Sequence, residues 1–226
     1  SHVGLVSGYG VALGYLGSIA GMKLVQPFVE SGGRSLAFLP TAGLLLFFSL
    51  PCFLFVKDAE TRTTPSFRIK EAFHRLKETF LRARQYRSLF RFILIHFLVL
   101  DAVNTIIAFM SVYANKVIGF SDGQIIKFLI SSTVGAMIGS LIIGILVKYK
   151  GVIWSYWLVL ALWIVALSLT AISQSETLFW VVGPIAGIGM GGVWVVSRAF
   201  IIELSPPEKV GEFFGLYGFA GKAASI

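Results

Sequence analysis

Long apolar stretches recur along the whole chain, and they constrain the fold more than any other feature of the sequence. A helix needs about 20 apolar residues to cross the hydrocarbon layer of a membrane, whereas buried strands take about 4–8 residues. Six stretches reach the helical length, and they run Gly4–Val25, Leu36–Val56, Phe92–Ala114, Gln124–Val147, Val152–Ile172 and Leu178–Leu204. A seventh begins near Glu212. The sequence therefore predicts an all-α integral membrane protein with about seven transmembrane helices.

The composition excludes a water-soluble fold. Hydrophobic residues make up 56% of the chain and charged residues 13%, with a mean hydropathy of +0.83. Soluble domains carry about 25% charged residues. The sequence has one cysteine, three isolated histidines and no phosphate-binding loop of the Walker type, so we expect no metal and no other cofactor.

The basic residues are unevenly distributed, and their positions predict the orientation of the helices. The net charge is +8, and ten of the nineteen Lys and Arg lie between Lys57 and Arg91. Lys148, Lys150 and Lys209 fall on the same side of the expected membrane. Cytoplasmic loops carry an excess of basic residues, so this side is predicted to be cytoplasmic. The charge indicates contact with the anionic lipid bilayer and no binding of nucleic acid.

Residues 57–91 form the one long polar segment of the chain. Pro65 suits the first turn of a helix, and apolar residues recur at helical spacing between Ile69 and Phe80. This pattern is typical of an amphipathic helix lying on anionic lipid. A solvated linker whose apolar edge rests on the bundle explains it equally well.

The two ends of the chain are similar to each other. When residues 3–19 are shifted by 207 positions onto residues 210–226, six of seventeen positions are identical. The first and the seventh helix stand six apart and run in the same direction. Such an arrangement indicates a parallel repeat of a six-helix unit.

Small residues also recur every four positions, in two series that would let helices approach closely. The series are Ser132, Ala136, Ser140 and Gly144, and Gly183, Gly187 and Gly191.

A motif between two of the helices resembles a loop of the major facilitator superfamily. Residues 144–151 read Gly-Ile-Leu-Val-Lys-Tyr-Lys-Gly and are similar to the motif Gly-x-Leu-x-Asp-[Arg/Lys]-x-Gly. Gly144 and Gly151 match the two glycines of this motif, Lys150 falls at its variable seventh position, and Lys148 stands where Asp is usual. A charge-relay role of that Asp is therefore not expected here.

A second resemblance is more specific. Residues 197–225, from Ser-Arg-Ala-Phe through Pro-Pro-Glu-Lys to Gly-Lys-Ala-Ala-Ser, are similar to the signature of the vacuole-effluxer-like family. This is the family of autophagy-related protein twenty-two and its bacterial relatives. Residues 8–17, Gly-Tyr-Gly-Val-Ala-Leu-Gly-Tyr-Leu-Gly, resemble the fifth helix of the same family.

The resemblance implies helices five to eleven of a twelve-helix bundle. Residues 1–56 would be the last two helices of the N-terminal bundle, 57–91 the central cytoplasmic loop, and 92–226 a C-terminal bundle truncated in its fifth helix. The family implies a secondary transporter, and its fungal vacuolar members are linked to amino-acid efflux. We expect the inner membrane if the protein is bacterial, and the vacuolar membrane if it is fungal.

Three ionisable residues lie deep within the expected spans. Placing one such residue at the centre of a membrane helix costs about 2.5–3.5 kcal/mol, so we expect each of the three to have a functional or structural role. At about 1.5 Å per residue, Asp101, Arg198 and Lys222 lie about 12–16 Å from the cytoplasmic ends of their helices. Transporter sites lie near the same depth.

This layer of charges supports two interpretations. Asp101 could bind a proton or cation, and Arg198 or Lys222 could hold an anionic group such as an amino-acid carboxylate. Asn104 and Thr105 share a helix face with Asp101 and would line the same cavity. Alternatively, the three charges form a structural ion pair and the polar residues join helices.

Three classes of function remain open. The leading hypothesis is a secondary active transporter that moves a small solute, with an amino acid as one candidate and proton or cation coupling. The alternatives are a membrane sensor or scaffold that does not transport, and a membrane-embedded lipid-handling enzyme. We expect no enzymatic activity, because no serine sits in a nucleophile turn opposite a histidine.

Overall fold

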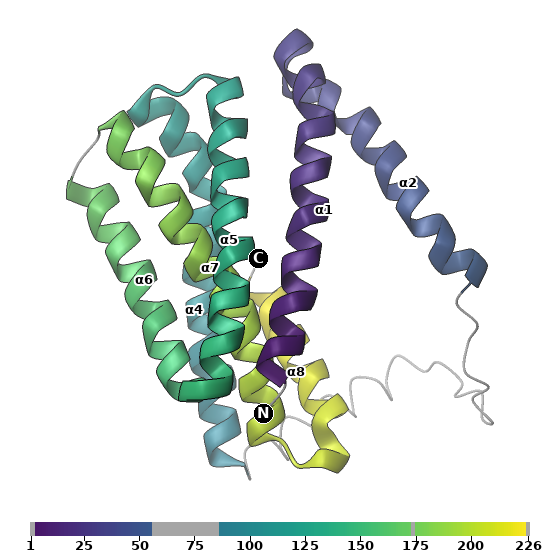
Figure 1. Ribbon diagram of the computed structural model, residues 1–226, viewed down its shortest axis with the longest axis vertical. Helices are drawn as coiled ribbons and strands as arrows, with labels where there is room; N and C mark the ends of the chain where they lie inside the picture. The colour runs from purple at the N-terminus through teal and green to yellow at the C-terminus, as the bar shows by residue number, and fades with distance from the viewer. Residues whose placement is uncertain (1–2, 56–85, 173–174, 225–226) are drawn as a thin grey trace.

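The computed structural model describes residues 3–55, 86–172 and 175–224, and the elements in these ranges are all helical (Figure 1). In chain order they are α1 (Val3–Gly32), the 3-10 turn η1 (Arg34–Ala37), α2 (Phe38–Phe55), α4 (Arg87–Tyr113), the π-helical turn η2 (Ala114–Ile118), α5 (Asp122–Lys150), α6 (Val152–Ile172), α7 (Glu176–Leu204), the 3-10 turn η3 (Pro207–Lys209) and α8 (Val210–Ala223). Six of the described helices are long and apolar enough to span a membrane. The predicted all-α membrane fold is confirmed.

Four of the six helices are longer than the apolar stretches that predicted them, α6 coincides with its stretch, and α2 is shorter. The first was expected to end near Val25, but α1 continues to Gly32, because its polar end keeps helical geometry beyond the hydrocarbon. Gly33 and Gly151 follow α1 and α5 with φ of 86° and 85°, a region that only glycine adopts readily. The predicted amphipathic helix lies outside the described residues.

Helices α5 and α7 pack backbone to backbone along the small-residue series. A Cβ built on Gly187 would overlap the carbonyl oxygen of Ser132, and one on Gly191 would overlap that of Ala136. The approach is reciprocal, because a Cβ on Gly139 would lie 2.5 Å from the Ile188 Cα. The small residues thus allow the close approach that the sequence indicated, and we call this contact between the two helices the α5/α7 seam.

A second close contact joins α1 to α5. A Cβ on Gly8 would lie 2.7 Å from the carbonyl oxygen of Ser140, and one on Gly144 would lie 2.7 Å from that of Gly4. The Ser140 Oγ also lies 3.3 Å from the Gly8 carbonyl oxygen, to which it donates. We call this contact the α1/α5 seam.

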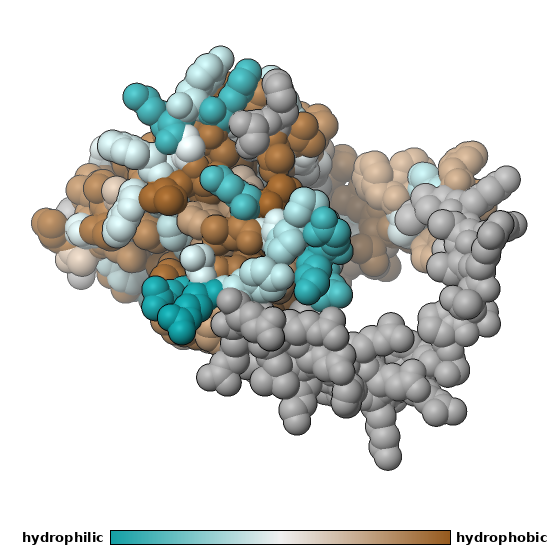
Figure 2. Space-filling view, turned by 90° about the horizontal axis from the view of Figure 1, so that it is seen from below, coloured by the Kyte–Doolittle hydropathy of each residue, from teal (hydrophilic) through white to brown (hydrophobic). Residues whose placement is uncertain are grey.

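The surface of the molecule is that of a protein embedded in lipid. Helix α2 leans away from the other helices (Figure 1), and its Leu39 and Phe53 are 84% and 83% exposed. Figure 2 looks at the end where α1 and α8 begin; hydrophilic residues are scattered over this face and hydrophobic residues flank them. Lys148, Lys150 and Lys209 lie at this end, which we call the basic end.

Candidate transport pathway

A cavity of about 200 Å³ lies among α1, α4, α5, α6 and α7. We call it the central cavity. Its walls are mostly apolar and include three methionines. The lining residues are Tyr15, Met22, Ile106, Ile107, Met110, Phe128, Leu129, Ser132, Thr133, Ala136, Trp163, Gly183, Ala186, Gly187 and Met190.

The polar groups of the central cavity are few. The hydroxyls of Ser132 and Thr133 donate to carbonyl oxygens one turn earlier in α5, at 2.9 and 2.7 Å. Trp163 is buried, and its indole Nε1 has no hydrogen-bond partner within the described residues.

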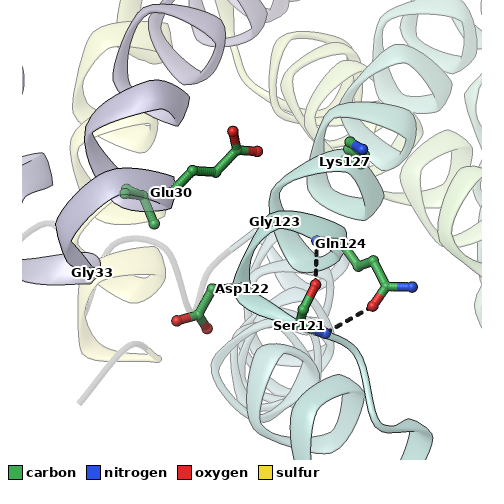
Figure 3. A pocket seen from close by; sticks show the side chains of 8 residues that line it. Glu30, Gly33, Ser121, Asp122, Gly123, Gln124 and Lys127 are labelled. Atoms are coloured by element: carbon green, nitrogen blue, oxygen red, sulfur yellow. Dashed lines mark hydrogen bonds between the residues drawn. The ribbon is translucent and has the colours of Figure 1, made fainter.

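A polar pocket of about 540 Å³ opens between α1 and α5 at the end opposite the basic end (Figure 3). The Glu30 side chain extends from α1 over Gly123, where a Cβ would lie 3.2 Å from Glu30 Oε1. Ser121 and Gln124 cap the start of α5 by exchanging hydrogen bonds between side chains and backbone. We call this pocket the outer mouth. Its polar lining suits contact with water.

The α1/α5 seam, the central cavity and the outer mouth follow one another along the length of α1 and α5. The α1/α5 seam lies toward the basic end, the outer mouth lies at the opposite end, and the central cavity lies between them. A solute in the central cavity would therefore be separated from the basic end by backbone packed directly against backbone.

Arg198 is the predicted site residue with the most informative surroundings. It lies on α7, and its charge acts on the phenol groups of Tyr15 in α1 and Tyr217 in α8. Tyr15 also lines the central cavity. Tyr217 is fixed by Ser197, whose Oγ lies 2.8 Å from the phenol oxygen. Tyr15 therefore lines the cavity and lies within electrostatic range of a guanidinium group.

None of the five predicted pathway residues is among those that line the central cavity: Arg198 is exposed on α7, and the other four lie on α4 and α8. Asp101 and Thr105 are exposed on α4, and Lys222 is exposed on α8. Asn104 joins the two helices, because its Nδ2 donates to the Ala224 carbonyl oxygen at 3.4 Å. The predicted ion pair of Asp101 with a base stays a prediction.

The residues of the loop motif lie in a helix contact, in a turn and on the exposed surface of the basic end. Gly144 is buried in the α1/α5 seam, and Gly151 makes the turn after α5. Lys148 and Lys150 are exposed at the basic end, and the Lys148 Nζ lies 5.2 Å from the centre of the Tyr149 ring. This contact is a cation–π interaction.

Sequence reasoning did not single out the aromatic residues of the pathway. Tyr15 and Trp163 occur among many aromatic residues in apolar helices, and their spacing does not distinguish a cavity wall from a lipid-facing surface. Buried tyrosine and tryptophan usually find a hydrogen-bond partner. The tendency of buried tyrosine and tryptophan to have a hydrogen-bond partner is the one signal that could have identified Tyr15 and Trp163.

Long apolar helices grouped around a cavity, with a polar mouth at one end, define a multi-pass helical membrane protein. The family described as "Vacuole effluxer Atg22 like" matches residues 3–226, and the chain belongs to that family.

Two relatives support this assignment. The uncharacterized MFS-type transporter YxiO of Bacillus subtilis (strain 168) is 30% identical over 237 residues, which cover 100% of this chain and 55% of the relative. An uncharacterized protein of Aquifex aeolicus (strain VF5) is 26% identical over 228 residues, covering 98% of this chain and 54% of the relative. The chain thus spans about half the length of the curated relatives it matches.

Proposed function

We propose that the chain is part of a secondary active transporter that moves a small solute by alternating access. The observation that carries the proposal is the central cavity between α1 and α4–α7, bounded by the outer mouth and the α1/α5 seam. Transporters of this kind bind solute near the middle of the membrane and rock one bundle against the other. Helix α1 would belong to one bundle, and α4–α8 to the other.

The arrangement around Arg198 suggests the kind of solute. The apolar walls of the central cavity suit an apolar group, and Arg198 beyond Tyr15 suits a carboxylate. An amino acid carries both, and we propose it as the transported solute. Asp101, with Asn104 and Thr105 on its helix face, is the proposed proton or cation site.

The coupling role of Asp101 is tested with the variant Asp101→Asn in the complete protein. We expect proton-gradient-driven accumulation of amino acids in proteoliposomes to fall at least about tenfold, because an amide cannot carry the proton, while membrane insertion is unchanged. Uptake of a radiolabelled amino-acid mixture, inside-alkaline, measures the effect. Glu208→Gln, which removes an exposed carboxylate from a turn, should accumulate normally. Full accumulation by Asp101→Asn would make Asp101 structural.

The role of Arg198 is tested separately through the concentration dependence of uptake. A hydrogen bond to a charged group contributes about 1.5–3 kcal/mol, so Arg198→Gln should raise the half-saturating concentration of a carboxylate solute by about tenfold or more. Arg198→Lys keeps the charge without the bidentate geometry and should be intermediate. An unchanged half-saturating concentration in both variants would remove Arg198 from the solute site.

A further inference from the structure

His96 is a buried histidine that the proposed pathway does not use. It lies on α4 and is 1% exposed, and neither Nδ1 nor Nε2 has a hydrogen-bond partner within the described residues. A neutral imidazole carries one donor and one acceptor, and an unsatisfied buried polar group costs about 1–3 kcal/mol. A buried side chain with two unsatisfied nitrogens therefore calls for a functional explanation.

Two aromatic rings contact His96, one from its own helix and one from α8. Its ring stacks on Tyr217 of α8, with centroids 5.2 Å apart. Tyr217 is held by Ser197 of α7, and Ser197 donates to the Val193 carbonyl oxygen at 2.6 Å. The phenol proton of Tyr217 therefore goes to Ser197 and is not available to the imidazole.

Tyr156 of α6 completes this group, which we call the His96 cluster (His96, Tyr156, Ser197 and Tyr217). Its ring and the ring of His96 both contact Phe92, at 5.9 and 5.5 Å between centroids. The Tyr156 hydroxyl is also buried without a partner among the described residues. Two unsatisfied polar side chains in one cluster indicate a place for water or a proton.

The His96 cluster lies near the basic end. His96 stands nine residues after Arg87, where α4 begins, and Tyr156 stands four residues after Val152, where α6 begins, so they lie about 14 Å and about 6 Å along their helices from that end. The hydroxyl of Ser205, which ends α7 at the same end, is likewise buried without a partner among the described residues. The cluster is therefore nearer to the basic end than to the outer mouth.

We propose that His96 is a proton-binding site reached from the basic end, and that its protonation is linked to separation of α8 from α4. The inference rests on the proposed function, because it supplies a second coupling residue for the same transport cycle. The bound species is the proton itself, which an imidazole nitrogen accepts from water at the basic end.

The link between protonation and separation follows from the surrounding charges. The titratable and charged groups that face the cluster are Tyr217 from α8, Tyr156 from α6 and Arg198 from α7, which acts on Tyr217. On α4 itself, Arg91 and Asp101 stand five residues to either side, about 140° around the helix. None of the three facing groups is a carboxylate, so an imidazolium in the closed cluster is disfavoured. Protonation therefore favours a conformation that admits water.

The size of the effect can be calculated. A histidine in water has a pKa of about 6.5. If only the separated form binds the proton, the ratio of separated to closed molecules rises about tenfold between pH 7.5 and pH 5.5.

Spin-label distances measure this ratio without any solute. The complete protein, with Cys52→Ser, carries labels at Leu98 of α4 and Phe219 of α8, which are 59% and 58% exposed. In lipid nanodiscs we expect a longer distance whose population ratio rises about tenfold from pH 7.5 to pH 5.5. The variant His96→Phe keeps the stacked ring but has no group that titrates. The variant His96→Gln removes the ring as well as the titratable group. Both variants should show the same distances at every pH.

The control variant Glu212→Gln removes a carboxylate from α8 itself and should respond to pH as the parent protein does. A pH response that persists in His96→Phe overturns the inference. A response that disappears in Asp101→Asn but persists in His96→Phe assigns the proton to Asp101 instead. If the parent protein transports amino acids but shows no pH-dependent separation of α8 from α4, this inference is wrong and the proposed function still stands. The His96 cluster then holds structural water only.

Discussion

The variant Gly187→Val is expected to lose the packing of α5 against α7, and with it most of the folded protein in detergent. A Cβ at this position would overlap the carbonyl oxygen of Ser132 and lie 3.1 Å from the backbone nitrogen of Ala136. Backbone atoms cannot rotate aside as a side chain can, so the helices must separate. Overpacking of this kind costs about 3 kcal/mol, and separation also loses the close packing that drives helix association in lipid.

The matched control is Gly10→Val in α1. Both positions are glycines within long apolar helices, but a Cβ at Gly10 has no atom within 4 Å among the described residues. Thermal unfolding followed by size-exclusion chromatography measures both variants. We expect Gly10→Val to stay within about 0.5 kcal/mol of the parent protein. Equal losses of stability in the two variants would mean that valine destabilises these helices through its low helix propensity. The loss in Gly187→Val would then not be caused by the α5/α7 seam.

The fold was largely predictable from the sequence because each transmembrane helix is encoded locally. Twenty apolar residues in a row have one stable arrangement in a bilayer, and glycines such as Gly151 mark the turns. The partners of the helices were not predictable. The α5 series divides between two neighbours: Ser132 and Ala136 face α7, whereas Ser140 and Gly144 face α1. A four-residue spacing defines a helix face, but it does not show where another helix crosses it.

The candidate site was predictable only in part. Charged residues are conspicuous in apolar helices, so the cost of placing them in a membrane marked Asp101 and Arg198 as candidates, and their role in transport stays a prediction. The central cavity is built from residues such as Met110 and Ala186 that a lipid-facing helix also uses, and only their three-dimensional arrangement distinguishes the two. His96 was set aside as a metal ligand because the histidines are isolated, although its proposed role comes from having no hydrogen-bond partner among the described residues.

The variant Gly8→Val is expected to abolish net transport while leaving the C-terminal bundle folded. A Cβ on Gly8 would lie 2.7 Å from the Ser140 carbonyl oxygen, so valine keeps α1 and α5 apart toward the basic end. Two conformations of a transporter differ by a few kcal/mol, and overpacking costs about 1–3 kcal/mol. The form closed at the basic end should therefore become about tenfold to a hundredfold rarer. Net flux requires both forms and should fall by a similar factor.

Two measurements separate this effect from simple misfolding. Spin labels at Val6 of α1 and Tyr149 of α5, which are 71% and 73% exposed near the basic end, should report a longer distance in Gly8→Val, while the melting temperature changes little. Gly14→Val places the same side chain on α1 where a Cβ has no atom within 4 Å among the described residues, so it should keep both the distance and the flux of the parent protein. Normal flux in Gly8→Val would show that the α1/α5 seam does not need to close. The barrier at the basic end would then be formed elsewhere, because a seam that tolerates valine cannot be the contact that excludes water.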